Sequence, residues 1–369
     1  MDTQDFYFEL PPGQIAQHPP ARREEARLFC LCRGQRPLHR RIGALAEYAR
    51  PGDVWVFNDT KVVKARLWGR KASTGGRVEL LVTEPLEGGL SMGEGLGRPL
   101  AGQAWRCMGR SSKGFRVGER LLLGEGEGKG EGLRAEIHSL EEGGFIGVVF
   151  EGEGSMGGVL ERWGHTPLPP YIRRRATPED SRRYQTTYAQ AEGSIAAPTA
   201  GLHFTPALME ALRGAGARLA FVRLDVGLGT FMPLRGPRIE AHPMHEEACF
   251  VSEEAAGVVN EALEGGKRVI AVGTTVVRCL EGCSEGGRLE AGHRRTGIFI
   301  YPGYRFRVVG GLLTNFHLPC STLLMLVAAF WGREEILEAY REAVAEGYRF
   351  YSYGDAMWLE GGGALAGSF

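Results

Sequence analysis

Small residues surround two polar side chains in one short segment of the chain, 193–204. Thr199 and His203 lie there among glycine and alanine, and Thr205 and Pro206 follow directly. Small residues let a ligand approach the backbone closely, and a helix N-terminus favours a carboxylate or phosphate group. The segment is therefore a candidate site for an anionic ligand. A close-packed turn with a buried histidine explains the same residues without a ligand.

Two loops follow predicted strands, at the positions where α/β proteins bind ligands. The loop 227–230 comes after a strand predicted over 220–226. The second loop, 273–275, comes after a strand predicted over 268–272 and opens a helix that contains Arg278. Neither loop has the glycine spacing of a dinucleotide-binding motif or a phosphate-binding loop. A capping threonine explains 273–275 equally well, so neither loop identifies a ligand by itself.

Histidine and glutamate in one short segment raise the question of a metal site. The order is His242-x-x-His245-Glu246, and no third ligand stands out. This order matches neither the H-E-x-x-H nor the H-x-x-E-H zinc motif. We therefore predict no metal ion, and we assign acid–base or hydrogen-bonding work to His245 and Glu246.

Polar groups lie beside aromatic rings in two later segments, 314–319 and 351–355. They supply an amide from Asn315, an imidazole from His317 and a carboxyl group from Asp355. Rings together with amides suit a purine base and its hydrogen-bonding edge. A buried polar network without any ligand has the same residue types.

Two basic clusters interrupt a chain whose formal net charge is zero. The first lies in 61–71. The second lies in 173–183, next to Tyr171 and Tyr184, whose rings are available for stacking. Clustered cations with aromatic residues favour RNA binding, although solvated protein surfaces also carry such runs. The residues of the second cluster expected to contact RNA are Arg173, Arg174, Arg175, Arg182 and Arg183.

The strands and helices predicted along the chain must bring these candidate site segments together. After residue 163 the pattern alternates between strands and helices, which predicts an α/β body with a mixed sheet. The middle of the chain has short alternating runs bounded by glycine or charged turns, which predicts a small barrel or sandwich. We therefore predict an α/β body made of 1–61 and 159–369, with an inserted small all-β, barrel-like domain at 62–158. The runs expected to form its strands are 78–83, 104–108, 120–123, 133–137 and 145–150.

Capping residues mark the ends of the expected helices. Thr205 and Ser321 are predicted N-caps, and Gly214 is predicted to end a helix in the left-handed conformation. The apolar run 297–301 is predicted to be a strand.

Composition bounds the class of protein. The chain has 369 residues, of which 43% are apolar and 24% charged, which is typical of a folded globular protein. Seven cysteines without a C-x-x-C pair fit neither a secreted disulfide framework nor a zinc ribbon. The segment 1–12 lacks the apolar stretch of a secretory signal, and the run 323–331 is too short to span a bilayer. We expect a cytoplasmic monomer without membrane contact.

Several stretches, taken together, carry a resemblance to a known family. They are Phe8 to Pro11, Gly52 to Val62, Gly164 to Ile172, Tyr184 to Ala189, Gly193 to Phe204, Val226 to Phe231, His242 to Glu246, Thr314 to Leu326 and Tyr348 to Met357. They resemble the S-adenosylmethionine:tRNA ribosyltransferase-isomerases (QueA) of queuosine biosynthesis. The similarity covers most of 5–80 and 163–357 and fades between them. Asp225 departs from the family pattern, which usually has histidine there, so we expect no essential imidazole at this position.

The resemblance implies a reaction that uses S-adenosylmethionine as a ribosyl donor. The ribosyl carbons are transferred to 7-aminomethyl-7-deazaguanine at the wobble position of the tRNA anticodon and isomerised there, giving epoxyqueuosine in tRNA. Adenine and methionine leave, and no methyl group moves. The chemistry requires a base for the proton on the carbon next to the sulfonium, a donor near the departing adenine and a site closed to water.

The resemblance also implies which residues do this work. We expect His203 or Glu246 to be the base, and Asn315 and Tyr353 to lie at the purine edge. The titratable groups in matching segments are His203, His245, Glu246, His317 and Asp355. The groups expected to hold the methionine carboxylate, ribose and adenine are Thr199, Gly201, Gly229, Thr230, Thr274, Thr275 and Arg278.

Two other functions stay open at this point. A methyltransferase or metal hydrolase acting on a small nucleotide would transfer a methyl group or lose its activity in chelator. An RNA-binding protein whose inserted barrel reads tRNA shape would have no activity, and small barrels are common RNA-binding modules. The acid–base residues beside glycine loops favour an enzyme.

We predict that turnover needs no added metal ion or redox cofactor, because the sequence has neither a convincing ligand set nor a dinucleotide motif. Turnover should be the same before and after dialysis against a chelator. A complete loss of turnover that one specific metal restores would contradict this prediction.

Overall fold

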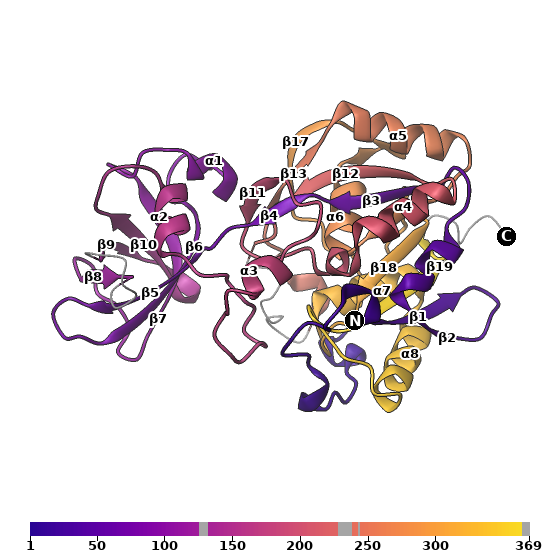
Figure 1. The fold of residues 1–369 in the computed structure, drawn as a ribbon, viewed down its shortest axis with the longest axis horizontal. Helices are drawn as coiled ribbons and strands as arrows, with labels where there is room; N and C mark the ends of the chain where they lie inside the picture. Colours follow the sequence, from indigo (N-terminus) through magenta and orange to yellow (C-terminus); the bar gives the residue numbers. More distant parts are fainter. Residues whose placement is uncertain (125–131, 228–237, 243, 364–369) are drawn as a thin grey trace.

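The computed structural model describes residues 1–124, 132–227, 238–242 and 244–363. Two bodies lie next to each other along the longest axis of the molecule (Figure 1). Both ends of the chain form an α/β body, and the segment between them forms a β-barrel. The predicted combination of a mixed-sheet α/β body and a small all-β module is confirmed.

The α/β body is built on one nine-stranded mixed sheet. Its strands, in spatial order, are β17 (Gly292–Thr296), β13 (Glu247–Val251), β12 (Arg218–Leu224), β3 (Val54–Asn58), β14 (Val269–Val272), β18 (Gly311–Asn315), β19 (Ala356–Glu360), β1 (Arg27–Cys32) and β2 (Leu38–Arg41). The four central strands β12, β3, β14 and β18 are parallel to one another. Their carboxyl ends therefore lie along a single edge of the sheet.

The central strands are buried on both faces, which explains their continuous apolar runs. In β3, Val54 and Val56 belong to one hydrophobic cluster, and Trp55 and Phe57 belong to another. The 3-10 helix Ile42–Tyr48 packs into the second cluster together with one α-helix, α4 (Pro206–Gly214). The helices of the first cluster are α5 (Glu253–Glu264), α6 (Thr274–Gly282), α7 (Thr322–Trp331) and α8 (Arg333–Ala345).

The predicted helix starts are confirmed by their caps. The Thr205 hydroxyl accepts a hydrogen bond from the Leu208 backbone N–H at 3.2 Å, which starts α4. The Ser321 hydroxyl accepts one from the Leu324 N–H at 3.2 Å, which starts α7. Such caps satisfy backbone donors that the first turn of a helix leaves without partners.

The predicted left-handed stop at Gly214 is wrong. Gly214 is the last helical residue of α4, and Gly216 takes the left-handed conformation, with φ of 86°. The turn comes two residues later because the N–H of Ala215 still bonds to the Ala211 carbonyl.

The predicted strand 297–301 is also wrong. The strand at this sheet edge is β17, which ends at Thr296 opposite Glu247. The backbone N–H of Ile298 then donates to the Thr296 hydroxyl at 3.3 Å instead of to a neighbouring strand. The apolar side chains that suggested a strand belong to an irregular segment. They pack against the hydrophobic cluster that contains α5 to α8.

The barrel is closed and has six antiparallel strands. In spatial order they are β10 (Phe145–Phe150), β7 (Ala104–Ser111), β6 (Arg77–Pro85), β5 (Arg66–Lys71), β8 (Arg120–Leu123) and β9 (Leu133–Leu140). All five runs predicted to be strands of this module are strands. Closure leaves no exposed sheet edge, and alternate residues such as Leu80, Trp105 and Val148 fill the interior.

Short elements join the two bodies. β4 (Thr60–Val62) pairs in parallel with β11 (Ala191–Ser194) between the barrel and the large sheet, and α3 (Asp180–Arg183) lies nearby (Figure 1).

Two helices, α1 (Met92–Leu96) and α2 (Met156–Trp163), pack into the barrel core. The predicted boundary at 158 falls inside α2, and the division into domains stays a prediction. A further two-stranded ribbon comprises β15 (Ser284–Glu285) and β16 (Arg288–Leu289).

A buried ion-pair network ties three strands of the large sheet together. Arg268, directly before β14, donates to both carboxylate oxygens of Asp53, which precedes β3. It also lies 2.8 Å from Glu360 at the end of β19. Removing one member of such a network leaves a buried charge without its partner, which typically costs about 3–5 kcal/mol.

No helix in the described ranges has the length and apolar character needed to cross a membrane.

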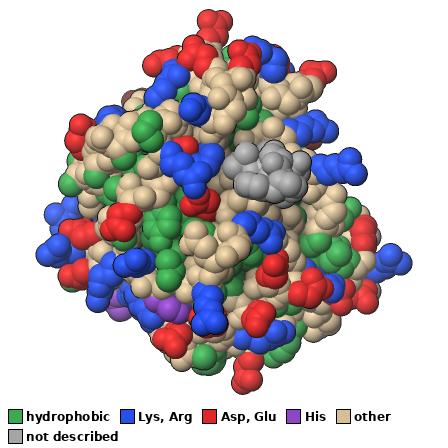
Figure 2. Space-filling view, turned by 90° about the vertical axis from the view of Figure 1, so that its right-hand side faces the viewer, with side chains coloured by type: hydrophobic (Ala, Val, Ile, Leu, Met, Phe, Trp, Pro, Cys, Tyr) green, Lys and Arg blue, Asp and Glu red, His purple; other side chains and the backbone are tan. Residues whose placement is uncertain are grey.

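Figure 2 shows the end of the α/β body that lies opposite the barrel. Positively and negatively charged side chains are interspersed there, without a patch of one sign. A surface for a polyanion is therefore better sought elsewhere on the molecule.

Candidate active site

A hollow at the carboxyl ends of β14 and β18 brings predicted site residues together from three parts of the chain. Thr199 begins the 3-10 helix Thr199–His203. Thr274 and Thr275 begin α6, and Asn315 ends β18. His317, two residues further along, completes the set of five predicted residues that line this hollow.

Asn315 joins the segments that form the hollow. Its Oδ1 accepts a hydrogen bond from Thr199 Oγ1 at 2.8 Å, and its Nδ2 lies 3.2 Å from His203 Nε2. The same Nδ2 donates toward the carbonyls of Tyr351 and Asp355, at 3.3 and 3.4 Å. Because an amide nitrogen only donates, His203 Nε2 must accept, and the imidazole is neutral. Burial lowers the pKa of His203 to about 3, in agreement with a neutral ring.

His317 is also neutral, because its ring is buried. Its Nε2 lies 2.9 Å from Thr314 Oγ1, and its backbone N–H donates to the Tyr340 hydroxyl at 3.2 Å. Burial lowers the pKa of His317 to about 3. Both imidazoles therefore act as uncharged hydrogen-bonding groups in this arrangement.

Thr275 has a buried hydroxyl that lacks a partner. Among the described residues lining the hollow, Thr275 Oγ1 is the buried side-chain oxygen without a hydrogen bond. An unsatisfied buried hydroxyl typically costs about 1–3 kcal/mol. It lies in the first turn of α6, after Gly273 with φ of 102°, where free backbone N–H groups favour an anion. The hollow is therefore equipped to bind a carboxylate or a hydroxyl group of a ligand.

Aromatic rings form another part of the lining. Tyr171 and Tyr351 lie with ring centroids 3.8 Å apart, and the Tyr171 hydroxyl is 2.5 Å from Ser352 Oγ. Tyr351 has a left-handed backbone, with φ of 72°, which is uncommon for a bulky residue. Its N–H bonds to the Phe316 carbonyl and its carbonyl accepts from the Gly354 N–H, so local contacts hold this conformation.

Three predicted site residues have structural partners instead of facing the hollow. The Asp355 carboxylate accepts from the backbone N–H groups of Arg27 and Arg349, at 2.9 and 2.8 Å. The Tyr353 hydroxyl donates to Asp180 at 2.8 Å. A Cβ added to Gly201 would meet the Tyr188 hydroxyl at 2.1 Å, so this glycine is needed for packing against Tyr188.

Arg278 and the 242–246 segment lie at the same sheet edge, outside the lining. Arg278 forms a buried ion pair with Glu247, whose other oxygen accepts from the Gly227 N–H at 3.0 Å. The Nη2 atom of Arg278 has no hydrogen-bond partner among the described residues. His245 and Glu246 are exposed, and Glu246 forms an ion pair with Arg295 at 3.2 Å. The predicted site residues Gly229 and Thr230 lie outside the described part of the chain.

The second basic cluster divides into two groups. Arg174 binds both oxygens of Asp180, and Arg183 donates to the carbonyls of residues 20 and 21. Arg173, Arg175 and Arg182 are exposed. Arg173 and Arg175 line a cleft of about 500 Å³ between the barrel and the α/β body, and Arg175 lies 5.3 Å from the ring of Trp68 on the barrel. This cleft is the better candidate surface for a nucleic acid.

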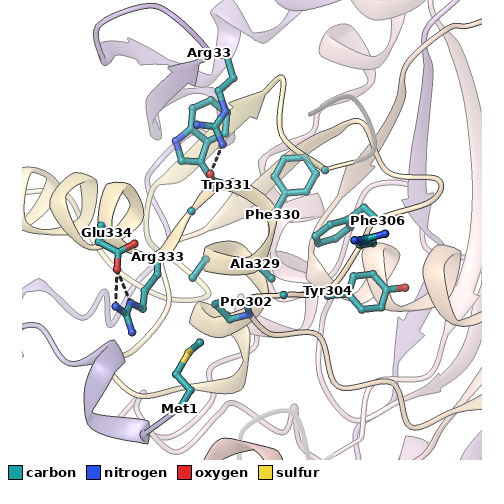
Figure 3. A pocket seen from close by; sticks show the side chains of 15 residues that line it. Met1, Arg33, Pro302, Tyr304, Phe306, Ala329, Phe330, Trp331, Arg333 and Glu334 are labelled. Carbon is teal, nitrogen blue, oxygen red and sulfur yellow. Dashed lines mark hydrogen bonds and ion pairs between the residues drawn. The ribbon is translucent and has the colours of Figure 1, made fainter. Parts of the chain in front are cut away.

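Another hollow lies elsewhere and contains none of the predicted site residues. It measures about 700 Å³ and is lined by residues of α7, α8 and the segment 302–306 (Figure 3). Two of its arginines have partners within the protein: Arg33 donates to the Trp331 carbonyl, and Arg333 donates to Glu334. Size alone does not make this hollow the active site.

Asp225 is a titratable group to which the sequence assigned no role. It follows β12, accepts a hydrogen bond from Thr60 Oγ1 at 2.9 Å and packs against Gly193. Burial raises its pKa to about 6. The sequence marks Asp225 as a departure from the family pattern, and the raised pKa marks its carboxyl group as a candidate functional group.

The fold and the site together define an α/β protein that binds a small ligand at the ends of parallel strands and carries a barrel beside the site. The family model of the queuosine biosynthesis proteins matches residues 3–359. The chain belongs to this family.

Similar proteins agree with this assignment over nearly the whole chain. The S-adenosylmethionine:tRNA ribosyltransferase-isomerase of Syntrophotalea carbinolica is 50% identical, covering 97% of this chain and 100% of its own. The protein of the same name from Moorella thermoacetica is 49% identical, with the same coverage. A crystal structure of the S-adenosylmethionine tRNA ribosyltransferase from Thermotoga maritima is 36% identical, covers 96% of this chain and 99% of its own, and has a TM-score of 0.53.

We predict that Asp225 makes the folded protein less stable as the pH rises. With a pKa of about 6 it binds its proton more tightly in the folded protein than in the unfolded chain, where the pKa is about 3.9. The stabilising contribution is complete below about pH 4 and is lost as the pH rises through about 6. Asp225→Asn should therefore lose less unfolding free energy between about pH 5 and 7.5 than the parent, measured by urea unfolding. The same change in both proteins would contradict the raised pKa.

Proposed function

We propose that this protein is an S-adenosylmethionine:tRNA ribosyltransferase-isomerase. It transfers the ribosyl group of S-adenosylmethionine to 7-aminomethyl-7-deazaguanine at the wobble position of tRNA and isomerises it, giving epoxyqueuosine and releasing adenine and methionine. Membership of the queuosine biosynthesis family over nearly the whole chain supports this function. The single structural observation that carries it is the Thr275 hydroxyl at the start of α6, which has no hydrogen-bond partner among the described residues.

The first turn of α6 suits the methionine carboxylate of S-adenosylmethionine. The helix N-terminus offers backbone N–H groups, and Thr274 and Thr275 offer hydroxyls in the same turn. Asn315 and Thr199, across the hollow, offer an amide and a hydroxyl to the ribose and adenine. The hollow encloses only about 30 Å³, so a nucleoside enters only when its lining segments separate.

The base for the proton next to the sulfonium is assigned to Glu246. His203 is less suited, because its ring is neutral with a pKa of about 3 and its Nε2 already accepts from Asn315. We assign His203 a positioning role toward Asn315. Glu246 lies directly before β13, at the sheet edge that also carries the hollow, and its carboxylate is accessible.

The tRNA is placed in the cleft between the barrel and the α/β body. Arg173 and Arg175 supply exposed cations there, and Trp68 supplies a ring on the barrel side. Cations and rings together bind single-stranded loops such as an anticodon loop, through phosphates and stacked bases. A tRNA substrate is also consistent with the expected cytoplasmic location, and we propose a monomer that works without a metal ion.

The proposed function is tested by the mass of the modified nucleoside. The protein is incubated with S-adenosylmethionine and tRNA that carries the aminomethyl-deazaguanine. The nucleoside should gain the mass of the epoxycyclopentenyl group, with adenine and methionine released in equal amounts. A gain of one methyl group, or no change in mass, would show that the protein has another function.

Thr275→Val should weaken S-adenosylmethionine binding without weakening the fold. The valine removes a hydroxyl that has no hydrogen-bond partner within the described part of the chain, so the melting temperature should stay the same or rise. A lost hydrogen bond to a charged group is worth about 1.5–3 kcal/mol, so the KM for S-adenosylmethionine should rise about tenfold or more. Thr275→Ser keeps the hydroxyl and should behave as the parent. An unchanged KM in the valine variant would refute this role.

Glu246→Gln should lower kcat by about 10²- to 10⁴-fold, the usual contribution of a general base. The melting temperature should stay within error of the parent, because the side chain is exposed and glutamine keeps its shape. Glu253→Gln, an exposed acid in the first turn of α5, is the matched control. If Glu246→Gln turns over within a few-fold of the parent at saturating substrates, the base is another group.

The double variant with Arg173→Ala and Arg175→Ala should bind tRNA more weakly and with a shallower salt dependence. Each lost phosphate contact lowers the slope of log K against log salt by about one unit. Arg174 is left in place because it holds Asp180. The control replaces two exposed arginines elsewhere, Arg213 and Arg288. An unchanged slope in the first variant would show that its arginines form only a solvated surface.

A further inference from the structure

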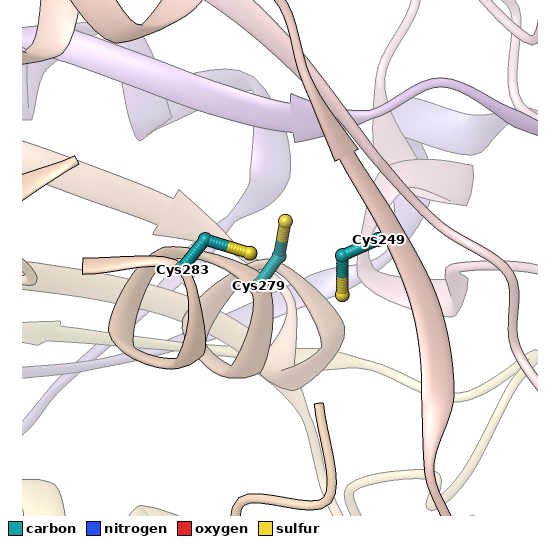
Figure 4. A group of neighbouring side chains, drawn as sticks. All are labelled: Cys249, Cys279 and Cys283. Carbon is teal, nitrogen blue, oxygen red and sulfur yellow. The ribbon is translucent and has the colours of Figure 1, made fainter. Parts of the chain in front are cut away.

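Three cysteine side chains converge at a place that the proposed reaction does not use. Cys249 lies on β13, and Cys279 and Cys283 lie one helical turn apart, on α6 and at its C-terminal cap. All three sulfur atoms lie within 4.8 Å of one another. Figure 4 shows the three side chains side by side. Each residue is at most 2% exposed. The cluster is therefore a set of three soft ligands held by two packed elements.

The spacing of the sulfurs suits a metal ion bound by thiolates. Zinc–sulfur bonds are about 2.3 Å long, so three sulfurs around one ion lie about 4 Å apart. The cysteine sulfurs need only small inward movements to reach this separation. Thiolates select soft ions over magnesium or calcium, which prefer oxygen ligands.

The charge around the cluster suits a divalent ion. Three thiolates and one divalent ion carry a net charge of −1, which is costly to bury without a compensating cation. Arg294 on β17 lies directly opposite Cys249 in the antiparallel pair. Opposite residues in such a pair point to the same face of the sheet, so this cation is on the side of the sheet where the cysteines meet.

The protein does not need an ion to satisfy these thiols. The Cys249 thiol donates to the Glu247 carbonyl at 3.8 Å, and the Cys279 thiol donates to the Arg223 carbonyl at 3.7 Å. An ion would replace these weak hydrogen bonds by stronger ligation and would join β13 to α6. Each ligating thiol would release its proton to solvent, so the binding step needs no oxidant.

We propose that Cys249, Cys279 and Cys283 form a binding site for one soft divalent metal ion, such as Zn²⁺ or Cd²⁺. The site lies one to two turns behind the first turn of α6 and supplies no group to the ribosyl transfer. It therefore stands independently of the proposed function, and retention of turnover in chelator is compatible with it.

The test is a titration of tag-free, fully reduced protein with Cd²⁺ under anaerobic conditions. The thiolate-to-metal charge-transfer absorption in the ultraviolet should saturate at one ion per chain. Cys249→Ser, Cys279→Ser and Cys283→Ser should each weaken Cd²⁺ binding at least tenfold, because one thiolate ligand is lost. Cys107→Ser, which changes a buried cysteine in the barrel, should bind as the parent does.

A second measurement covers the case in which serine variants fail to fold. The parent is incubated with Cd²⁺, and its thiols are then alkylated during mild heating and located by mass spectrometry. Cd²⁺ should protect Cys249, Cys279 and Cys283 and should raise the melting temperature of the parent. Absence of saturable binding, or protection of other cysteines such as Cys30 and Cys32, would overturn the proposal.

Discussion

One amide side chain holds the candidate site together. Asn315 ends β18 and bonds at once to Thr199, to His203 and to the backbone near Tyr351. Two of these partners belong to the 3-10 helix Thr199–His203 and the third to a later segment, so the hollow exists only when all three segments have folded. Buried polar networks of this kind are stable when every member has a partner, and they then fix a unique geometry. In this network the His203 imidazole must accept the hydrogen bond from Asn315, so the ring is neutral.

The parallel centre of the sheet gives this network its place. β12, β3, β14 and β18 run in one direction, so the segments that follow them reach the same edge. α6 begins there with its N-terminus toward the hollow, and none of the described residues gives the Thr275 hydroxyl a hydrogen-bond partner. The edge therefore combines a rigid frame with unsatisfied donors, which is what a site for a carboxylate-bearing ligand needs. A protein that only bound RNA would have no use for such a hollow beside its barrel.

Features that depend on local pattern could be predicted from the sequence. Runs such as Val54 to Phe57 and Phe145 to Phe150 formed strands because apolar residues bounded by turns have few alternatives. The strand predicted over 297–301 failed because apolar residues also pack well from an irregular segment when hydrogen-bond partners come from side chains. Partners far apart in sequence were not predictable. Tyr353 binds Asp180, which lies 173 residues away, and Asp355 binds the backbone N–H of Arg27, which lies 328 residues away, and neither pairing leaves a local signal.

Calorimetry with S-adenosylmethionine and with its neutral carboxamide analogue, in the parent and in Thr275→Val, measures whether the start of α6 binds the methionine carboxylate. The parent should bind the carboxylate form at least tenfold more tightly, which is about 1.4 kcal/mol, and the variant should discriminate much less. An identical preference in both proteins, or no preference in the parent, would show that the carboxylate binds elsewhere.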